Sequence, residues 1–172
     1  MAKKAGARKP ARRARRDSAP VDTRGVGYAP GLVMEIPLDA GRFAYGVSLG
    51  SVYVRYHDQA WPEPMDDLDA VLATPTLFVL AGATEAIRTK RWRKVGQVQL
   101  TDEERRLPPF CMRQDSPPYR CYIVEVGDWP TKRLATPEEC EGLEEMAVYR
   151  PEHVERRLNE HFAKRSSRRP AS

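Results

Sequence analysis

Between positions 32 and 57, the pattern of apolar and polar residues is typical of consecutive β-strands. An apolar run over residues 32–38 ends at the turn-forming segment Asp39-Ala40-Gly41. Residues 42–49 then alternate apolar and polar side chains, and residues 51–57 follow directly after Gly50. Because the connections are short, these three strands are predicted to form an antiparallel meander.

Three later segments, 76–80, 92–100 and 119–126, also have strand-like patterns. Gly96 interrupts the second of them and indicates a kink. Residues 102–118 are charged and rich in proline, so we expect a long irregular loop there.

Helices are expected only near the end of the chain. Thr136 and Glu139 have the spacing of a capping box, which predicts a short helix carrying Cys140 and Leu143. Pro151 predicts the start of a second helix, whose apolar residues share one face: Val154, Leu158 and Phe162. The fold class is therefore α+β, a curved antiparallel β-sheet or a small SH3-like barrel with C-terminal helices.

The alternation also predicts which side chains form the core. Either face of a strand can be the inner one, so inversion of a whole strand is the expected error. The predicted core residues are Phe43, Tyr45, Val47, Val52, Val54, Leu77, Val79, Val95, Cys121, Ile123, Leu158 and Phe162.

Charge divides the 172 residues into three parts. Residues 1–24 have nine basic and two acidic side chains, a charge of +7, and are expected to be a disordered basic tail. Residues 164–172 add +4 as a second disordered tail. Since the whole chain carries +5, residues 25–163 carry −6 and are expected to fold as one acidic domain. An acidic domain does not suit nucleic-acid binding, so the N-terminal tail is either a solubilising extension or a weak nucleic-acid contact.

Several protein classes are excluded by composition. No apolar run has the roughly 20 residues of a membrane helix, and no apolar signal segment follows the basic N-terminus. The three cysteines form no C-x-x-C pair, which disfavours a disulfide framework or a structural zinc site. These features favour a cytoplasmic protein without a membrane partner.

No catalytic or cofactor-binding motif is present. The sequence has no phosphate loop, no G-x-G-x-x-G, no H-E-x-x-H and no G-x-S-x-G. A small hydrolase is the weakest alternative. It would use His57 with Asp58, although adjacent strand residues point to opposite faces. It could instead use Cys111, which is expected to be an exposed thiol in the proline-rich loop. We therefore expect a protein that is not an enzyme and has no cofactor and no metal.

Clusters of acidic residues are the strongest candidates for a binding surface. An acidic surface attracts basic partners and raises association rates. An aromatic residue beside such charges is typical of an interface hot spot, although tryptophans such as Trp92 and Trp129 more often anchor a core or its rim. The predicted partner-binding residues are Trp61, Asp66, Asp67 and Asp69, followed by Asp102, Glu103 and Glu104.

Two short blocks resemble the signature of the Immunity protein 26 family. The residues that carry this resemblance are Ile36, Pro37, Leu38, Gly41, Arg42, Ala44, Tyr45 and Gly46, then Trp92 and Gly96. The similarity extends over about residues 31–126. It implies a bacterial antitoxin-like protein that binds and neutralises a polymorphic toxin, which could be a basic nuclease, without chemistry of its own. The alternative function is a nucleic-acid-binding module that uses the basic tail and a β-sheet domain.

Overall fold

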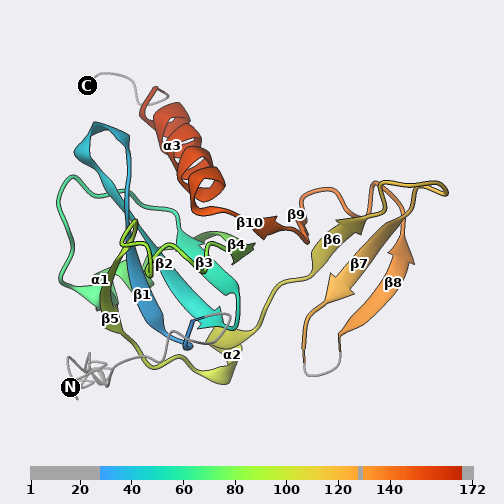
Figure 1. Ribbon diagram of the computed structural model, residues 1–172, viewed down its shortest axis with the longest axis horizontal. Helices are drawn as coiled ribbons and strands as arrows, with labels where there is room; N and C mark the ends of the chain where they lie inside the picture. Colours follow the sequence, from blue (N-terminus) through green and yellow to red (C-terminus); the bar gives the residue numbers. More distant parts are fainter. Residues whose placement is uncertain (1–27, 128–129, 168–172) are drawn as a thin grey trace, which may run out of the picture.

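The computed structural model describes residues 28–127 and 130–167, and Figure 1 shows their arrangement. Their strands form two sheets, one of six strands and one of four. The helix α3 (Pro151–Ser167) lies across one face of the larger sheet, and the smaller sheet stands to the side. The predicted tail at residues 1–24 lies outside the described residues, as do residues 168–172.

The larger sheet contains the predicted meander. Its strand order is β10-β4-β3-β2-β1-β5, and the β10–β4 pair is parallel while the others are antiparallel. The antiparallel β1–β2–β3 pairing confirms the prediction for residues 32–57. The strands are β1 (Leu32–Pro37), β2 (Phe43–Gly50), β3 (Tyr53–His57), β4 (Thr76–Gly82), β5 (Arg93–Gln97) and β10 (Val148–Tyr149).

The smaller sheet has the order β8-β7-β6-β9 and corrects the prediction for residues 102–118. Its strands are β6 (Phe110–Arg113), β7 (Cys121–Glu125), β8 (Thr131–Ala135) and β9 (Glu144–Glu145). The segment predicted as an irregular loop contains both β6 and the short helix α2 (Asp102–Arg105). A strand of four residues is too short for its alternation to stand out among flanking prolines.

The helix predicted at Thr136 is wrong, although its capping box is formed. The Thr136 N–H donates to Glu139 Oε2 at 2.9 Å, and the Glu139 N–H donates to Thr136 Oγ1 at 3.2 Å. Only hydrogen-bonded turns follow, because Gly142 adopts a left-handed φ of +81° and β9 begins two residues later. A helix has no room to propagate between these points. The helix predicted at Pro151 is confirmed as α3.

Both faces of the larger sheet are covered, which explains the errors in the predicted core. Val154, Leu158 and Phe162 of α3 pack on one face, and the helix α1 (Leu68–Leu72) packs on the other. Side chains that point to either face of β1 are therefore buried, so the alternation of apolar and polar residues cannot show which face is the inner one. Predicted residues that are buried are Tyr45, Val47, Val54, Val79, Leu158 and Phe162. Those only partly buried are Phe43, Val52, Leu77, Val95, Cys121 and Ile123, while Val33, Met34, Ile36, Tyr56, Trp92 and Phe110 are buried but were not predicted.

The mixed α+β class is confirmed, but the SH3-like barrel is not found. Within the described residues, β10 and β5 lie at opposite ends of the strand order and do not pair, so the larger sheet stays open. The described residues form two open, mostly antiparallel sheets in place of one antiparallel sheet.

Candidate functional site

A buried polar network crosses the larger sheet beneath the first acidic cluster. The strand register places Glu35 between Arg93 on β5 and Tyr45 on β2. Arg93 donates from Nε and Nη2 to the two carboxylate oxygens of Glu35 at 2.9 and 2.8 Å, and the Tyr45 hydroxyl donates to Glu35 Oε2 at 2.8 Å. Glu35 is only 5% exposed, so its charge depends on these three donors.

Tyr45 also anchors the loop that carries the first acidic cluster. Its hydroxyl oxygen accepts the Met65 N–H at 2.6 Å, and its ring meets the Trp61 ring edge-on, with centroids 5.2 Å apart. Phe43 and Trp61 exchange two backbone hydrogen bonds of 2.9 Å, which pair the loop with the end of β2. Burial raises the pKa of Tyr45 to about 12, so the hydroxyl stays protonated and keeps both roles.

The first acidic cluster combines exposed charge with a helix cap. Asp66, Asp67 and Asp69 are all exposed. Asp67 Oδ1 accepts the N–H groups of Asp69 and Ala70 at 3.1 and 3.2 Å and so caps α1. Asp67 is thus partly structural. The side chains of Asp66 and Asp69 make no hydrogen bond or ion pair among the described contacts.

The second acidic cluster forms the first turn of α2. The Thr101 hydroxyl accepts the Glu104 N–H, and Glu104 Oε2 accepts the Thr101 N–H at 2.8 Å, which completes a capping box. Asp102 pairs with Arg105, and the Arg55 guanidinium on β3 donates to the main-chain oxygen of Glu104. Asp102 and Glu103 remain exposed at the surface of this helix.

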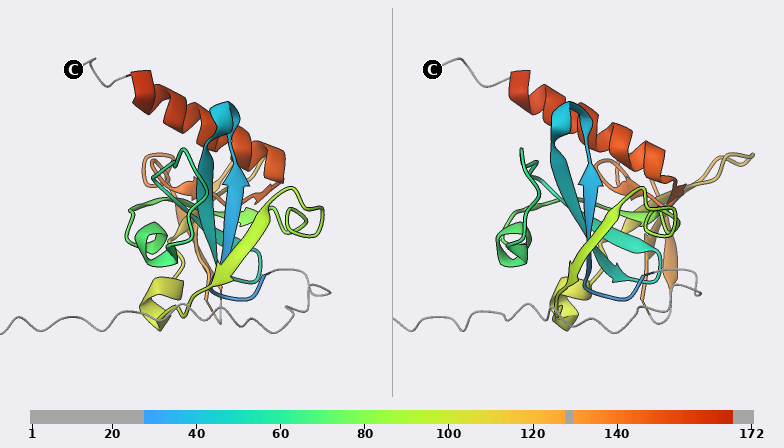
Figure 2. Two further views of the ribbon diagram at one scale, coloured as in Figure 1. Left: turned by 90° about the vertical axis from the view of Figure 1, so that its left-hand side faces the viewer. Right: turned by 60° about the vertical axis from the view of Figure 1, so that its left-hand side comes forward.

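The two acidic clusters lie on the same face of the larger sheet. Leu68 and Val71 of α1 pack with Val33, Tyr45 and Val47, and the residues flanking α2 pack beside them through Leu100. The helix α3 occupies the opposite face. Figure 2 shows α1 and α2 both away from α3.

The residues of the resemblance support both faces of the larger sheet, with Ile36 and Ala44 on the side of α3 and Tyr45 on the side of α1. Ile36 and Ala44 are fully buried. A Cβ atom at Gly96 would lie 2.5 Å from Leu68 Cδ1, and one at Gly46 would lie 2.9 Å from Val54 Cγ1. Glycine at position 96 therefore allows α1 to lie close to the sheet.

The structure places the weakest catalytic candidates apart. Asp58 pairs with His161 Nε2 at 2.7 Å and with Arg165 at 2.8 Å, not with His57. Burial lowers the pKa of His57, whose Nδ1 lies 3.1 Å from the Thr74 main-chain oxygen. The expected exposure of Cys111 is wrong, because Cys111 is buried on β6. Neither proposed hydrolase arrangement is formed by these residues.

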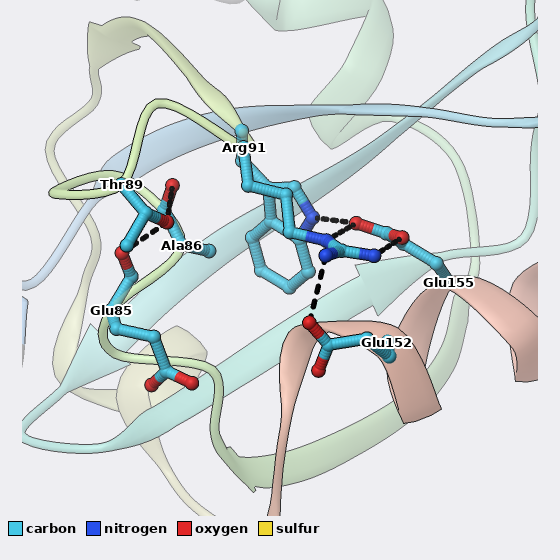
Figure 3. A network of polar contacts seen from close by, with 7 residues as sticks. Glu85, Ala86, Thr89, Arg91, Glu152 and Glu155 are labelled. Carbon is cyan, nitrogen blue, oxygen red and sulfur yellow. Dashed lines mark hydrogen bonds and ion pairs between the residues drawn. The ribbon is translucent and has the colours of Figure 1, made fainter.

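A polar contact that sequence reasoning missed attaches α3 to the sheet. Arg91 donates to Glu155 through Nε and Nη2 and to Glu152 through Nη1, each at 2.7 Å (Figure 3). The indole N–H of the buried Trp92 donates to the same Glu155 at 2.8 Å. Trp92 is thus a core anchor, as expected for a tryptophan beside a strand, whereas Trp129 lies outside the described residues.

Neither a metal-binding cluster nor a membrane-spanning helix is found among the described residues. No three His, Cys, Asp or Glu side chains in this part of the chain are grouped to hold a metal ion. None of the helices in residues 28–127 and 130–167 is long and apolar enough to cross a membrane.

Comparison with known proteins identifies the family. Residues 29–121 match the family model described as Immunity protein 26, which is more than half of the chain. The match includes both acidic clusters, the Glu35 network and Gly96, which lies beneath α1. No curated protein and no solved structure matches the chain. The chain therefore belongs to the Immunity protein 26 family, a family of immunity proteins of toxin systems.

Proposed function

We propose that this protein binds a cognate bacterial toxin in the cytoplasm and neutralises it without chemistry of its own. Family membership supports the immunity role. The observation that carries the proposed mode of binding is the position of two acidic clusters on one face, each at the start of a helix held by the sheet. The partner of this face is a basic protein, for which a nuclease toxin is the best candidate.

The acidic face suits rapid capture of a basic partner. Asp66, Asp69, Asp102 and Glu103 are exposed, and the two clusters that they form border the same face of the larger sheet. Opposite charge accelerates association at low ionic strength. Trp61 is half-buried beside the first cluster, so it offers an aromatic edge to a partner while its ring stays fixed against Tyr45.

The test is to reverse charge without removing a helix cap. We expect the double variant Asp66→Lys/Asp69→Lys to associate with the toxin about tenfold or more slowly at low salt, with a weaker salt dependence, because long-range attraction is lost. Asp67 is kept because it caps α1. Association rates measured by surface plasmon resonance at several salt concentrations check this prediction, together with inhibition of toxin activity.

A matched control reverses the same number of charges elsewhere. Glu141 and Glu160 are exposed, lie outside the acidic face and make no side-chain contact among those described, so Glu141→Lys/Glu160→Lys should leave association nearly unchanged. Equal association rates for Asp66→Lys/Asp69→Lys and the unaltered protein would reject this binding face. Absence of toxin binding by the unaltered protein would reject the immunity function itself.

A further inference from the structure

The outer strand of the smaller sheet has an open main-chain edge. The strand β8 comes first in the order β8-β7-β6-β9 and pairs with β7 alone, and Figure 1 shows it on the side away from the larger sheet. Bulges and short strands protect the other sheet ends from further pairing. The pairing of β5 with β1 has a register shift, and β9 and β10 have only two residues each. By contrast, β8 pairs over five consecutive residues without a shift, so it offers a regular edge that lacks these features.

The hydrogen bonds of the smaller sheet determine which main-chain groups of β8 point outward. Opposite residues in an antiparallel pair alternate between exchanging hydrogen bonds with each other and directing them to the other side. The Gln114 N–H donates to the main-chain oxygen of Arg120 at 2.9 Å, and two positions further along the ladder Met112 lies opposite Tyr122. Met112 and Tyr122 therefore also exchange hydrogen bonds, and the N–H and C=O groups of Tyr122 point toward β6.

A contact of β9 agrees with this orientation. The Cys111 main-chain oxygen accepts the Met146 N–H at 2.7 Å, so Cys111 directs its groups toward β9 and not toward β7, as the alternation requires. Since Tyr122 bonds to β6, the residue opposite it on β8, Leu134, receives no hydrogen bond from β7. The N–H and C=O groups of Leu134, and those of Lys132 two residues before it, point outward. None of these four groups has a main-chain partner among the described contacts.

The side chains of β8 indicate what kind of partner this edge fits. Leu134 is 61% exposed and extends an apolar row, because Met112, Tyr122 and Leu134 lie opposite one another on one face of the sheet. Arg133 lies on the other face, where its side chain is 59% exposed and reaches Glu139 at 2.8 Å. An added strand therefore meets an apolar side chain on one face and a positive charge on the other.

We propose that the outer edge of β8 binds an extended protein segment as an added antiparallel strand, with an acidic residue opposite Arg133 and an apolar residue on either side of it. The partner residues opposite Lys132 and Leu134 exchange four main-chain hydrogen bonds with them, which supply affinity. The residue opposite Arg133 lies in the closer type of pair, with Cα atoms about 4.5 Å apart. An acidic side chain there forms an ion pair with Arg133 and supplies specificity.

The same geometry disfavours a second copy of this chain on the edge. The two-fold pairing that satisfies all four outward groups in both copies is centred on Arg133, so the two Arg133 side chains lie directly opposite each other. Like charges in this position destabilise a strand pair. The edge is therefore selective for an acidic segment. It is separate from the acidic face of the larger sheet, so the proposal does not depend on toxin binding.

The experiment uses the full-length protein and two synthetic peptides. One peptide has a central glutamate flanked by valines, and the other has lysine in place of that glutamate. Amide hydrogen exchange is measured residue by residue by NMR. Without peptide, we expect the Lys132 and Leu134 amides to exchange at least about tenfold faster than the Arg133 amide, which bonds to β7. The acidic peptide should slow both amides, and the basic peptide should not.

Two variants separate the contributions of charge and main chain. Arg133→Glu should bind the acidic peptide about tenfold more weakly and should gain binding of the basic one, because the charge opposite the peptide is reversed. The matched control Arg156→Glu reverses an exposed charge on α3 and should change neither affinity. Leu134→Pro removes an outward N–H that makes no bond to β7, so it should weaken binding of the acidic peptide while circular dichroism stays unchanged.

Results on the unaltered protein can overturn the proposal even where a variant folds poorly. Slow exchange of the Lys132 and Leu134 amides without peptide, no slowing by the acidic peptide at millimolar concentration, or equal slowing by both peptides would each do so. Slowing that rises with protein concentration in the absence of peptide would identify a second copy as the occupant and would reject the acidic segment.

Discussion

At the scale of single residues, Tyr45 connects more parts of the molecule than any sequence pattern indicates. Its hydroxyl donates to the buried carboxylate of Glu35 and accepts the main-chain N–H of Met65, while its ring packs against Trp61. The buried charge, the sheet and the loop before the first acidic cluster therefore share one side chain. Loss of that hydroxyl leaves two buried polar groups with fewer partners.

We expect Tyr45→Phe to lower the free energy of unfolding by about 1–3 kcal/mol, because Glu35 loses a donor and Met65 loses its acceptor while the ring stays in place. Chemical denaturation measured by fluorescence checks this. Tyr53→Phe is the matched control, since no hydrogen bond of the Tyr53 hydroxyl is among the described contacts and burial is the cause that raises its pKa. A loss of similar size in both variants would contradict a special role for the Tyr45 hydroxyl.

His57 predicts a dependence of stability on pH. Burial lowers its pKa below the ordinary value of 6.5 in the folded protein, so the unfolded chain binds the proton more readily. The stability that neutral His57 contributes is therefore present above pH 6.5 and is lost as the pH falls through the lowered value. We expect the fall in unfolding free energy between about pH 7 and pH 5 to be smaller in His57→Gln. His153→Gln, at an exposed position, should retain the full fall.

Sequence patterns identified the acidic residues but not the network that supports them. Asp66 and Asp102 can be named from the sequence, because charged residues in loops and at helix starts are usually exposed. Glu35 was the one charged residue within a strongly apolar strand, which indicates a buried partner. The identity of that partner, Arg93, depends on the pairing of β1 with β5, which local sequence does not determine.

At the scale of elements, two capping boxes of the same spacing differ in whether a helix follows. Thr101 with Glu104 and Thr136 with Glu139 have the same spacing, and both make their reciprocal hydrogen bonds. The first begins α2, yet the second begins only turns. The local chemistry is satisfied in either case, and the position of the next strand decides whether a helix follows.

The helix α3 should contribute strongly to stability through its apolar face. Phe162 is 4% exposed and packs with Val154 and Leu158 in the core against the larger sheet. We expect Phe162→Ala to lower the free energy of unfolding by about 3 kcal/mol, because a large cavity forms. Thermal unfolding checks this, with Glu160→Ala on the exposed side of α3 as the control. An unchanged melting midpoint in Phe162→Ala would show that α3 contributes little to the core.

At the scale of the whole molecule, charge is divided between the chain ends and the body. The chain carries +5 in total although residues 25–163 carry −6. The positive net charge alone therefore suggests an acidic partner, whereas the acidic face suits a basic one. Long-range attraction depends on where the charges are placed, so the face and the N-terminal residues act in opposite directions on a basic partner.

Removal of residues 1–24 changes the net charge from +5 to −2. We expect this deletion to speed association with a basic toxin and to abolish any binding of nucleic acid, because the remaining body repels phosphates. Association rates and electrophoretic mobility shifts at physiological salt check the two effects. Tight nucleic-acid binding by the shortened protein would instead favour the nucleic-acid-binding alternative.

The position of α3 after the strands that it covers has a consequence for biosynthesis. Residues Met34, Ile36, Tyr56 and Trp92 pack against a helix that begins only at Pro151. A ribosome adds residues from the N-terminus, so β1 to β5 emerge with one apolar face uncovered until α3 follows them. Each new molecule therefore passes through a stage in which this apolar face is exposed to other chains, and this stage ends when α3 covers the face.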